Sequence, residues 1–141
     1  MSDVDPSAGS NVSQLAVTRR LASELARPRG GADGPWFSSF EDIPLVCIVT
    51  DPRGRILDAN RVAQLFLNVE RGLLRRKPLL HFVARRDARR FRMRLQDLGQ
   101  GALEPMVVQL RSRKGAACPM VLLIEQVAGR TDLLWTASPC G

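Results

Sequence analysis

Tyrosine is absent from this sequence of 141 residues, and histidine occurs once, as His81. The three cysteines, Cys47, Cys118 and Cys140, are far apart and form no C-x-x-C pair, so their spacing predicts neither a zinc site nor a disulfide framework. Acid–base or nucleophilic catalysis requires titratable groups that converge, and one imidazole with acids scattered mostly at turn positions offers no such set. We therefore expect no metal site and no enzyme activity.

Long hydrophobic runs are also missing. No apolar run approaches the roughly 18–20 residues that a membrane helix needs, and the acidic, polar start of the chain, MSDVDPSAGSNVSQ, is not that of a secretory signal. We expect a cytoplasmic protein without a membrane span. With 45% hydrophobic and 25% charged residues, the composition is typical of one globular domain plus a tail.

Positive charge is concentrated in one segment. The net charge is +7, yet between Arg71 and Arg94 ten lysine or arginine residues stand against a single acid, Asp87. One interpretation is a solvated helix surface in an arginine-rich composition, and the other is a surface for an anionic partner. No aromatic side chains alternate with these cations as stacking platforms, so we favour a solvated surface or a protein contact over nucleic acid. The candidate surface residues are Arg75, Arg76, Lys77, Arg85, Arg86, Arg89 and Arg90.

The N-terminal part predicts a tail, a helix and a linker. Residues 1–10 are small and polar and predict disorder. A helix is expected from Asn11, which can cap it, to Arg27, before the linker PRGGADGP. Residues 11–40 thus form a flanking segment that we expect to cover the domain or to contact a second copy. Its candidate contact residues are Leu15, Leu21, Leu25, Trp36 and Phe37.

A β-hairpin that leads directly into a helix is the clearest local pattern. The apolar run 45–49 is followed by DPRG at 51–54, whose composition is typical of a type I turn, and by a short strand over 55–58. Asn60 is then a good N-cap. The helix that follows is predicted to bury one face, formed by Val62, Leu65, Phe66 and Val69.

The second half of the chain predicts helices first and strands afterwards. Residues 70–82 indicate irregular structure with a helical turn near 79–82. A longer helix is expected over 84–98, with an inward stripe of Ala84, Ala88, Phe91, Leu95 and Leu98. The hydrophobic period then changes, and three strands over 106–110, 119–124 and 133–135 are expected to form an antiparallel meander.

The strands do not alternate between apolar and polar residues. An antiparallel sheet with one face in water should show that alternation, but 45–49 and 120–124 are apolar at every position. We therefore expect both faces of the sheet to be covered. The central helices account for one face, and either the N-terminal helix or a second subunit must cover the other.

These motifs, in this order, resemble the PAS domain over roughly residues 41–137. IVTDPRGRILDAN resembles the opening hairpin of the family with its Asn helix cap, and LLHFVARRDARRFRMRLQDL resembles the stretch where a buried hydrophobic pair precedes a helix. VVQLRSRKGAACPMVLLI resembles the long hairpin, and LLWTAS the closing strand. The resemblance implies an α+β fold, a PAS-like five-stranded antiparallel sheet with helices on one face. An N-terminal flanking helix and a C-terminal tail, 138–141, would complete this chain.

The family fold implies a small internal pocket, which side chains can either line or fill. The candidates for this pocket are Phe66, His81, Phe82, Phe91, Leu95 and Trp135. His81 lies where some relatives place an axial haem ligand, but a single histidine more often has a structural role, so we do not expect haem. Light-sensing relatives need a cysteine on the central helices, and this sequence has none between Cys47 and Cys118. We therefore expect no covalent flavin adduct.

The resemblance implies a regulatory module that senses a small ligand, binds a partner protein, or does both. No output domain follows Trp135 in this sequence, so we expect the signal to pass to a regulatory partner protein in trans, with a role in signal transduction and in the regulation of transcription. Because such domains often pair through the sheet face, we also expect a homodimer. The alternative is a basic adaptor that binds nucleic acid through the Arg71–Arg94 surface.

Overall fold

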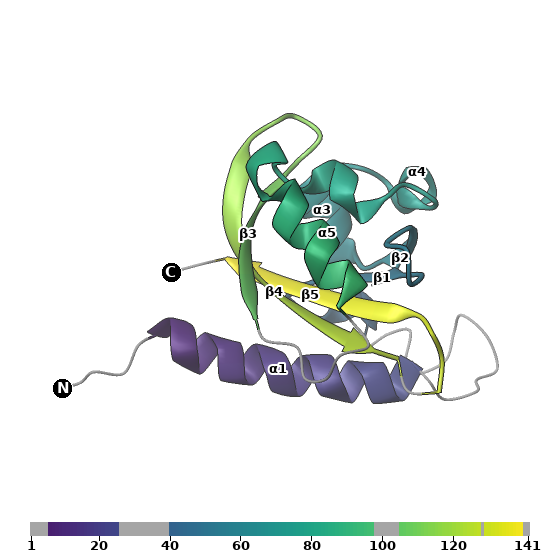
Figure 1. The fold of residues 1–141 in the computed structure, drawn as a ribbon. Coiled ribbons are helices and arrows are strands. Elements are labelled where there is room, and N and C mark those ends of the chain that lie inside the picture. The colour runs from purple at the N-terminus through teal and green to yellow at the C-terminus, as the bar shows by residue number, and fades with distance from the viewer. Residues whose placement is uncertain (1–5, 26–39, 98–104, 128, 140–141) are drawn as a thin grey trace.

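The computed structural model describes residues 6–25, 40–97, 105–127 and 129–139. One antiparallel sheet of five strands forms the centre of the molecule, in the order β2-β1-β5-β4-β3 (Figure 1). This confirms the five antiparallel strands that the sequence predicts. In chain order the strands are β1 (Val46–Thr50), β2 (Ile56–Ala59), β3 (Met106–Arg111), β4 (Ala117–Gln126) and β5 (Leu133–Pro139).

Two strands are longer than the hydrophobic pattern predicts. β4 spans Ala117–Gln126, and β5 continues to Pro139 instead of ending at Trp135. Pairing between the two strands continues through the polar part of β5, where Thr136 lies opposite Leu123 and Ser138 opposite Val121. Backbone hydrogen bonds extend a strand whatever its side chains are, so the first residues of the expected C-terminal tail belong to the sheet.

The turn between β1 and β2 has the hydrogen bonds expected from its sequence. The Gly54 amide donates to the Asp51 carbonyl at 3.0 Å, and the Asp51 side chain accepts from the amides of Arg53 and Arg55, both at 2.9 Å. Gly54 has a φ of +89°, a conformation that favours glycine. A Cβ atom added at Gly54 would also lie 3.2 Å from the Leu95 side chain, so the helix that carries Leu95 packs directly over the turn.

The helices between β2 and β3 cover one face of the sheet (Figure 1). The expected helix over 84–98 begins as a 3₁₀ turn and becomes α-helical at Ala88, and its last predicted residue, Leu98, lies outside the described residues. The expected helical turn near 79–82 is confirmed as a 3₁₀ turn. These elements are α3 (Arg61–Leu67), α4 (Arg71–Leu74), η1 (Leu79–Phe82), η2 (Arg85–Asp87) and α5 (Ala88–Gln96).

The predicted inward face of α3 is wrong at Leu65, whereas the other three predicted residues, Val69 included, pack against the core cluster. Leu65 is 74% exposed, whereas Ala63 and Leu67 are fully buried, with Val62 and Phe66 half-buried beside them. Two features determine which face of this helix is buried: a small side chain on the sheet side, and the N-cap. An alanine facing the sheet lets the helix approach closely, and a count of large apolar residues overlooks it.

Asn60 holds the start of α3 against β1. Its side-chain oxygen accepts from the Ala63 amide at 3.0 Å, as an N-cap should, and also from the Cys47 amide at 3.1 Å. Its side-chain amide donates to the carbonyls of Ile43 and Leu45. One fully buried side chain therefore joins the helix, the first strand and the segment that precedes it, and this sets the rotation of α3.

Helix α1 (Pro6–Leu25) lies against the opposite face of the sheet (Figure 1). It begins at Pro6 instead of at the predicted cap Asn11, so the end of the expected disordered tail is helical. Proline is favoured in the first turn of a helix, because N–H groups there have no acceptor within the helix and the lack of one costs nothing. Leu21 and Leu25 are buried on the sheet and Leu15 is half-buried. The predicted end of this helix at Arg27, the linker, Trp36 and Phe37 lie outside the described residues.

The sheet separates two apolar clusters, which confirms that both of its faces are covered. The larger cluster lies under α3, α4 and α5 and contains the inward residues of every strand, including Trp135. The smaller cluster joins α1 to the other face. Its buried members are Leu21, Ala22, Leu25, Phe40, Ile43, Cys47, Val127 and Leu134. Because α1 belongs to the same chain, a second subunit is not needed to cover this face.

Candidate functional site

Two of the predicted pocket residues fill the space between the helices and the sheet. Phe91 on α5 stacks on Trp135 on β5, with ring centroids 5.1 Å apart and planes inclined by 18°. Both side chains are buried, and the Trp135 indole donates to the Thr50 hydroxyl at 2.8 Å. Phe66 and Leu95 pack against the same cluster and are half-buried. These four residues form part of the core.

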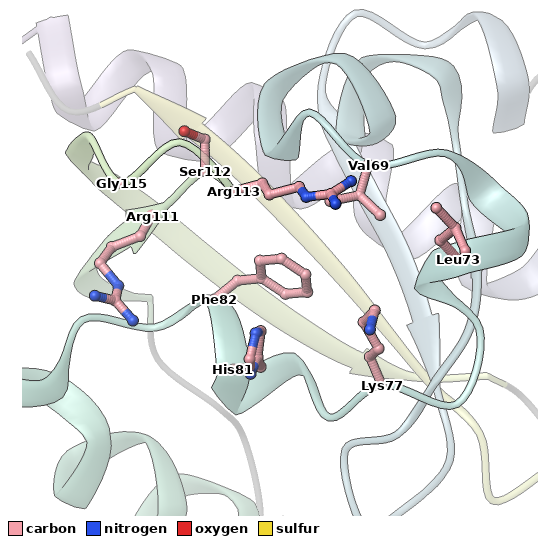
Figure 2. A pocket seen from close by; sticks show the side chains of 9 residues that line it. All are labelled: Val69, Leu73, Lys77, His81, Phe82, Arg111, Ser112, Arg113 and Gly115. Atoms are coloured by element: carbon pink, nitrogen blue, oxygen red, sulfur yellow. The ribbon is translucent and has the colours of Figure 1, made fainter.

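The other two predicted pocket residues, His81 and Phe82, line a cavity of about 330 Å³. It lies between η1, the segment around α4 and the turn that joins β3 to β4, and Figure 2 shows Phe82 among the side chains around it. The imidazole of His81 packs edge-on against the Phe82 ring, with centroids 5.2 Å apart. The full lining is Val69, Leu73, Lys77, His81, Phe82, Arg111, Ser112, Arg113 and Gly115.

Most of this lining was not among the predicted pocket residues. Lys77 belongs to the predicted basic surface, whereas no sequence pattern predicts a role for Arg111 or Arg113. In the sequence these two arginines belong to the basic segment RSRKG at 111–115, whose composition is typical of an ordinary hairpin turn. Only the folded hairpin brings this turn next to η1, because the two segments are far apart in the chain.

Backbone hydrogen bonds hold the walls of the cavity in place. The segment that carries Lys77 is tied to β2: the Ile56 amide donates to the Lys77 carbonyl at 2.8 Å, and the Arg76 amide donates to the Ile56 carbonyl at 2.7 Å. On the other side, the Arg113 amide donates to the Leu67 carbonyl at 2.9 Å, which fixes the β3–β4 turn against the end of α3. The cavity therefore has two anchored walls.

Arg76, next to Lys77, has an unusual backbone conformation. Its φ is +75°, in the left-handed region that residues with side chains rarely adopt. Such a conformation persists only where surrounding structure maintains it, and here the hydrogen bond to Ile56 does so. It turns the chain between α4 and η1 at the edge of the cavity.

A carboxylate clamp joins the helical side of the cavity to β3. Asp87 accepts from the Gln109 amide at 2.8 Å and from the Arg90 guanidinium at 2.9 Å. These bonds favour the ionised form, so the backbone N–H of Gln109 and then Arg90 lower the pKa of Asp87 below its ordinary 3.8, although burial opposes this. The Ala84 amide adds a bond to the Gln109 carbonyl at 2.8 Å. Phe82 and Arg111 are thus carried by segments bonded to each other.

The predicted basic surface separates into paired and unpaired residues. Arg71 at its start is structural: its guanidinium binds Glu41, Asp58 and the Ala59 carbonyl, which ties α4 to β2. Arg90 is committed to Asp87 and to the Val107 carbonyl at 2.7 Å. The remaining candidates are exposed and form no salt bridge with any described residue. They are Arg75, Arg76, Lys77, Arg85, Arg86 and Arg89.

The described cysteines lie in strands, and neither of them lines the cavity. Cys47 is buried on the α1 side of the sheet, and burial raises the pKa of its thiol to about 12. Cys118 is half-buried near the start of β4. Within the described ranges, no cluster of three or more His, Cys, Asp or Glu side chains could hold a metal ion. No helix in the same ranges is long and apolar enough to cross a membrane.

Comparison with known proteins shows likeness in structure but not in sequence. The sequence matches no protein-family model and no curated protein. The structure is similar to the PAS domain of an HTR-like protein from Haloarcula marismortui, with a TM-score of 0.60 and 19% identity over 72% of this chain and 90% of that one. It is also similar to the PAS domain of the quorum-sensing receptor RpfR from Cronobacter turicensis, with a TM-score of 0.62 and 14% identity over 71% and 97%.

A third similar structure is the LOV protein of Rhodobacter sphaeroides, with a TM-score of 0.64 and 14% identity over 72% of this chain and 63% of that chain. At such low identities the similarity concerns the fold. It agrees with the five-stranded antiparallel sheet and its helices described above. The described part of this chain has a PAS-like fold, with the N-terminal helix α1 on the outer face of its sheet.

Proposed function

We propose that this chain is a regulatory PAS module that senses a small ligand in the cavity between η1 and the β3–β4 turn. The observation that carries the proposal is the cavity itself, about 330 Å³ in volume with anchored walls, in a domain whose central core is otherwise filled by Phe91 and Trp135. Cavities of this size, with apolar walls and a few polar groups, are typical of small-molecule sites.

Two of the similar structures support ligand binding by this fold. The PAS domain of RpfR from Cronobacter turicensis is known in complex with BDSF and in complex with C12:0. Another similar structure is a domain of a sensory box histidine kinase from Geobacter sulfurreducens. These are properties of those proteins, and for the present chain they favour a sensory role.

The cavity favours binding over catalysis. Its lining includes one imidazole and three cationic side chains but no carboxylate and no cysteine. A general base with a positioned nucleophile needs such partners within hydrogen-bond reach. We therefore propose that occupancy of the cavity, and not turnover, is the signal.

The signal would pass to a partner protein, in a cytoplasmic pathway that regulates transcription. The exposed cations Arg85, Arg86 and Arg89 form no salt bridge with described residues and would suit an acidic surface on that partner. A homodimer is a further part of the proposal, and static light scattering of the purified chain tests it. A monomer at micromolar concentration would remove the dimer from the proposal.

The cavity proposal is tested with a matched pair of variants at two exposed leucines on the helical side of the domain. Leu73 is 54% exposed and lines the cavity, whereas Leu65 is 74% exposed and does not. We expect the purified chain to carry a small molecule that denaturation releases for mass spectrometry. Leu73→Trp should reduce its amount several-fold by occupying part of the cavity, and Leu65→Trp should not.

A chain that releases no small molecule and shows no thermal shift with any compound of a metabolite library would contradict ligand sensing. Equal occupancy in the two tryptophan variants would place the ligand elsewhere in the molecule.

The second candidate function is nucleic-acid binding through the unpaired cations of the Arg71–Arg94 surface. It is favoured by the exposure of Arg75, Arg76, Lys77, Arg85, Arg86 and Arg89, none of which forms a salt bridge with a described residue. Each phosphate that such cations contact would release counterions from the nucleic acid. Fluorescence anisotropy with labelled DNA and RNA across a salt series tests it. This function predicts an affinity that falls steeply with salt and falls again in Arg85→Gln with Arg89→Gln, and no binding at low salt excludes it.

A further inference from the structure

We propose that the cavity takes an amphipathic anion, a carboxylate or phosphate group attached to a small apolar body. This inference rests on the proposed function and specifies the chemistry of its ligand. The anionic group would be bound by Lys77 and Arg113, with Arg111 adding positive charge on the other side of Phe82, and the apolar part would pack on Phe82, Val69 and Leu73.

The charge of the cavity is the first argument. Lys77 comes from the loop between α4 and η1, and the two arginines come from the end of β3 and the following turn, yet all three line the same space (Figure 2). None of them forms a salt bridge or a side-chain hydrogen bond with a described residue, and the lining contains no carboxylate. Three cations that line one space without a carboxylate make the potential of that space positive, which favours an anionic ligand.

Comparison with the other arginines of the domain strengthens this argument. Arg71 and Arg90 each reach a carboxylate, so this chain does supply counterions where arginine serves the fold. The cations of the cavity lack such partners. Arginine is suited to bind planar carboxylate or tetrahedral phosphate oxygens through two parallel hydrogen bonds.

The apolar lining is the second argument, because a simple inorganic anion would not use it. Phe82 and Val69 are 4% and 7% exposed and present apolar surface to the cavity. Leu73 is 54% exposed, one of the few large apolar side chains that the domain leaves in water. An apolar group bound here would cover this leucine, which contributes about 25 cal/mol for each Å² removed from water.

The third argument is that the two halves of the site are held before a ligand arrives. The bonds from Ile56 to the Lys77 carbonyl and from Arg113 to the Leu67 carbonyl fix both cationic walls, and the left-handed Arg76 stands between the first wall and α4. A site that is already formed loses less entropy on binding. The volume of about 330 Å³ is at the small end of ligand sites and suits a short chain or a single ring.

The test uses four probes with the same eight-carbon chain: octanoate, octyl phosphate, 1-octanol and octylammonium. Isothermal titration calorimetry with the full chain, freed of any bound molecule, should show binding of octanoate or octyl phosphate. Octanol should bind at least tenfold more weakly, and octylammonium should not bind. The comparison of octanoate with octyl phosphate shows which anionic group is preferred, and 500 mM NaCl should weaken both.

Two double variants with equal loss of charge complete the test. Arg111→Gln with Arg113→Gln should weaken binding of the anionic probes by about tenfold or more, as expected for lost charge-assisted hydrogen bonds. Arg19→Gln with Arg20→Gln removes two exposed cations of α1, on the opposite face of the sheet from the lining, and should change binding less than twofold. Circular dichroism and the melting temperature confirm that both variants are folded.

The outcomes separate this inference from the proposed function. If octanol binds as tightly as octanoate and the Arg111/Arg113 variant binds like its control, the anion inference is wrong while a ligand-binding role stands. If a neutral or cationic molecule is released from the native protein, the same conclusion holds. If none of the probes binds, the inference is also overturned, and the release experiment decides the proposed function independently.

Discussion

The side-chain oxygens of Thr18 in α1 and Thr136 in β5 lie 2.7 Å apart, and both threonines are fully buried. Gln14, one turn earlier in α1, donates to the Thr136 hydroxyl at 3.1 Å and to the carbonyls of Thr136 and Val121. Ser138 donates to the Gln14 side-chain oxygen at 2.7 Å. Apolar contacts alone permit a helix to slide or rotate on a sheet. This satisfied polar network gives α1 one register, since any other position would leave its members buried without partners.

The network predicts coupling between the two threonines. Thr18→Val and Thr136→Val should each lower the free energy of unfolding by about 1–2 kcal/mol, because each leaves a buried polar group without one of its partners. The double variant should lose less than the sum, with a coupling of about 0.5 kcal/mol or more, as measured by urea denaturation. Strictly additive losses would mean that the two hydroxyls act independently.

We expect removal of α1 to expose one face of the sheet and, with it, Cys47. In the intact chain this thiol is buried in the cluster that α1 covers, and with a pKa of about 12 it stays protonated at pH 8. In a Cys118→Ser, Cys140→Ser background, Cys47 should resist a thiol reagent at pH 8. Deletion of residues 1–39 should make it reactive and cause aggregation or a change in oligomeric state.

Leu21→Ala, which shortens a fully buried side chain of α1, should increase the labelling rate of Cys47 without removing the helix. Light scattering provides the second readout for the deletion. A truncated domain that keeps an unreactive Cys47 and an unchanged mass would show that α1 does not protect this face in solution.

We expect alanine to destabilise the chain more at Gly54 than at Gly115, two glycines that lie in turns. Gly54 and Gly115 have φ values of +89° and +96°, so alanine is strained at both, by about 1 kcal/mol. At Gly54 the new methyl group would also lie 3.2 Å from Leu95, whereas at Gly115 nothing lies within 4 Å. Gly54→Ala should therefore lower the melting temperature more than Gly115→Ala. Equal shifts would mean that Leu95 moves away at no cost.

Asp87 predicts a loss of stability in acid. Its pKa is lower in the folded chain than the ordinary 3.8, because the Gln109 amide and Arg90 bind the ionised form. A lowered pKa contributes stability that is present above the unfolded pKa and is lost as the pH falls through the folded pKa, so this loss occurs below about pH 4. Asp87→Asn should be about 1–2 kcal/mol less stable at pH 7 and less sensitive to acid. Asp97→Asn, at an exposed position without a side-chain hydrogen bond to described residues, is the control; an equal effect of both variants would contradict the clamp.

Local patterns were sufficient for most of the fold. The turn at 51–54, the Asn60 cap, the helical turn near 79–82 and all five strands follow from residues that are close in sequence, because their hydrogen bonds are local or their periodicity is strong. Prediction was wrong where small or polar residues determine the structure. Ala63 faces the sheet in place of Leu65, and Thr136 and Ser138 extend β5 without any hydrophobic signal.

The candidate site was predictable only in part. Periodicity directs Phe82 inward in the sequence, and in the structure Phe82 and its neighbour His81 lie in the lining of the proposed site. Phe91 and Trp135 could have lined a pocket or filled it, and only their stacking distance shows that they fill it. Arg111 and Arg113 could not be joined to Lys77, because no local rule relates a hairpin turn to a loop that lies more than thirty residues earlier in the chain.

By itself, the sequence determined that the sheet is apolar on both faces and that positive charge gathers in the second half of the chain. Those are properties of composition and period, which a linear pattern carries. Tertiary structure alone decided that α1 covers the second face, that Arg71 and Arg90 are paired, and that Lys77, Arg111 and Arg113 meet around one cavity. The physical reason is that charge pairing and cavity formation depend on distances between segments remote in the chain, and only packing of the whole domain sets those distances.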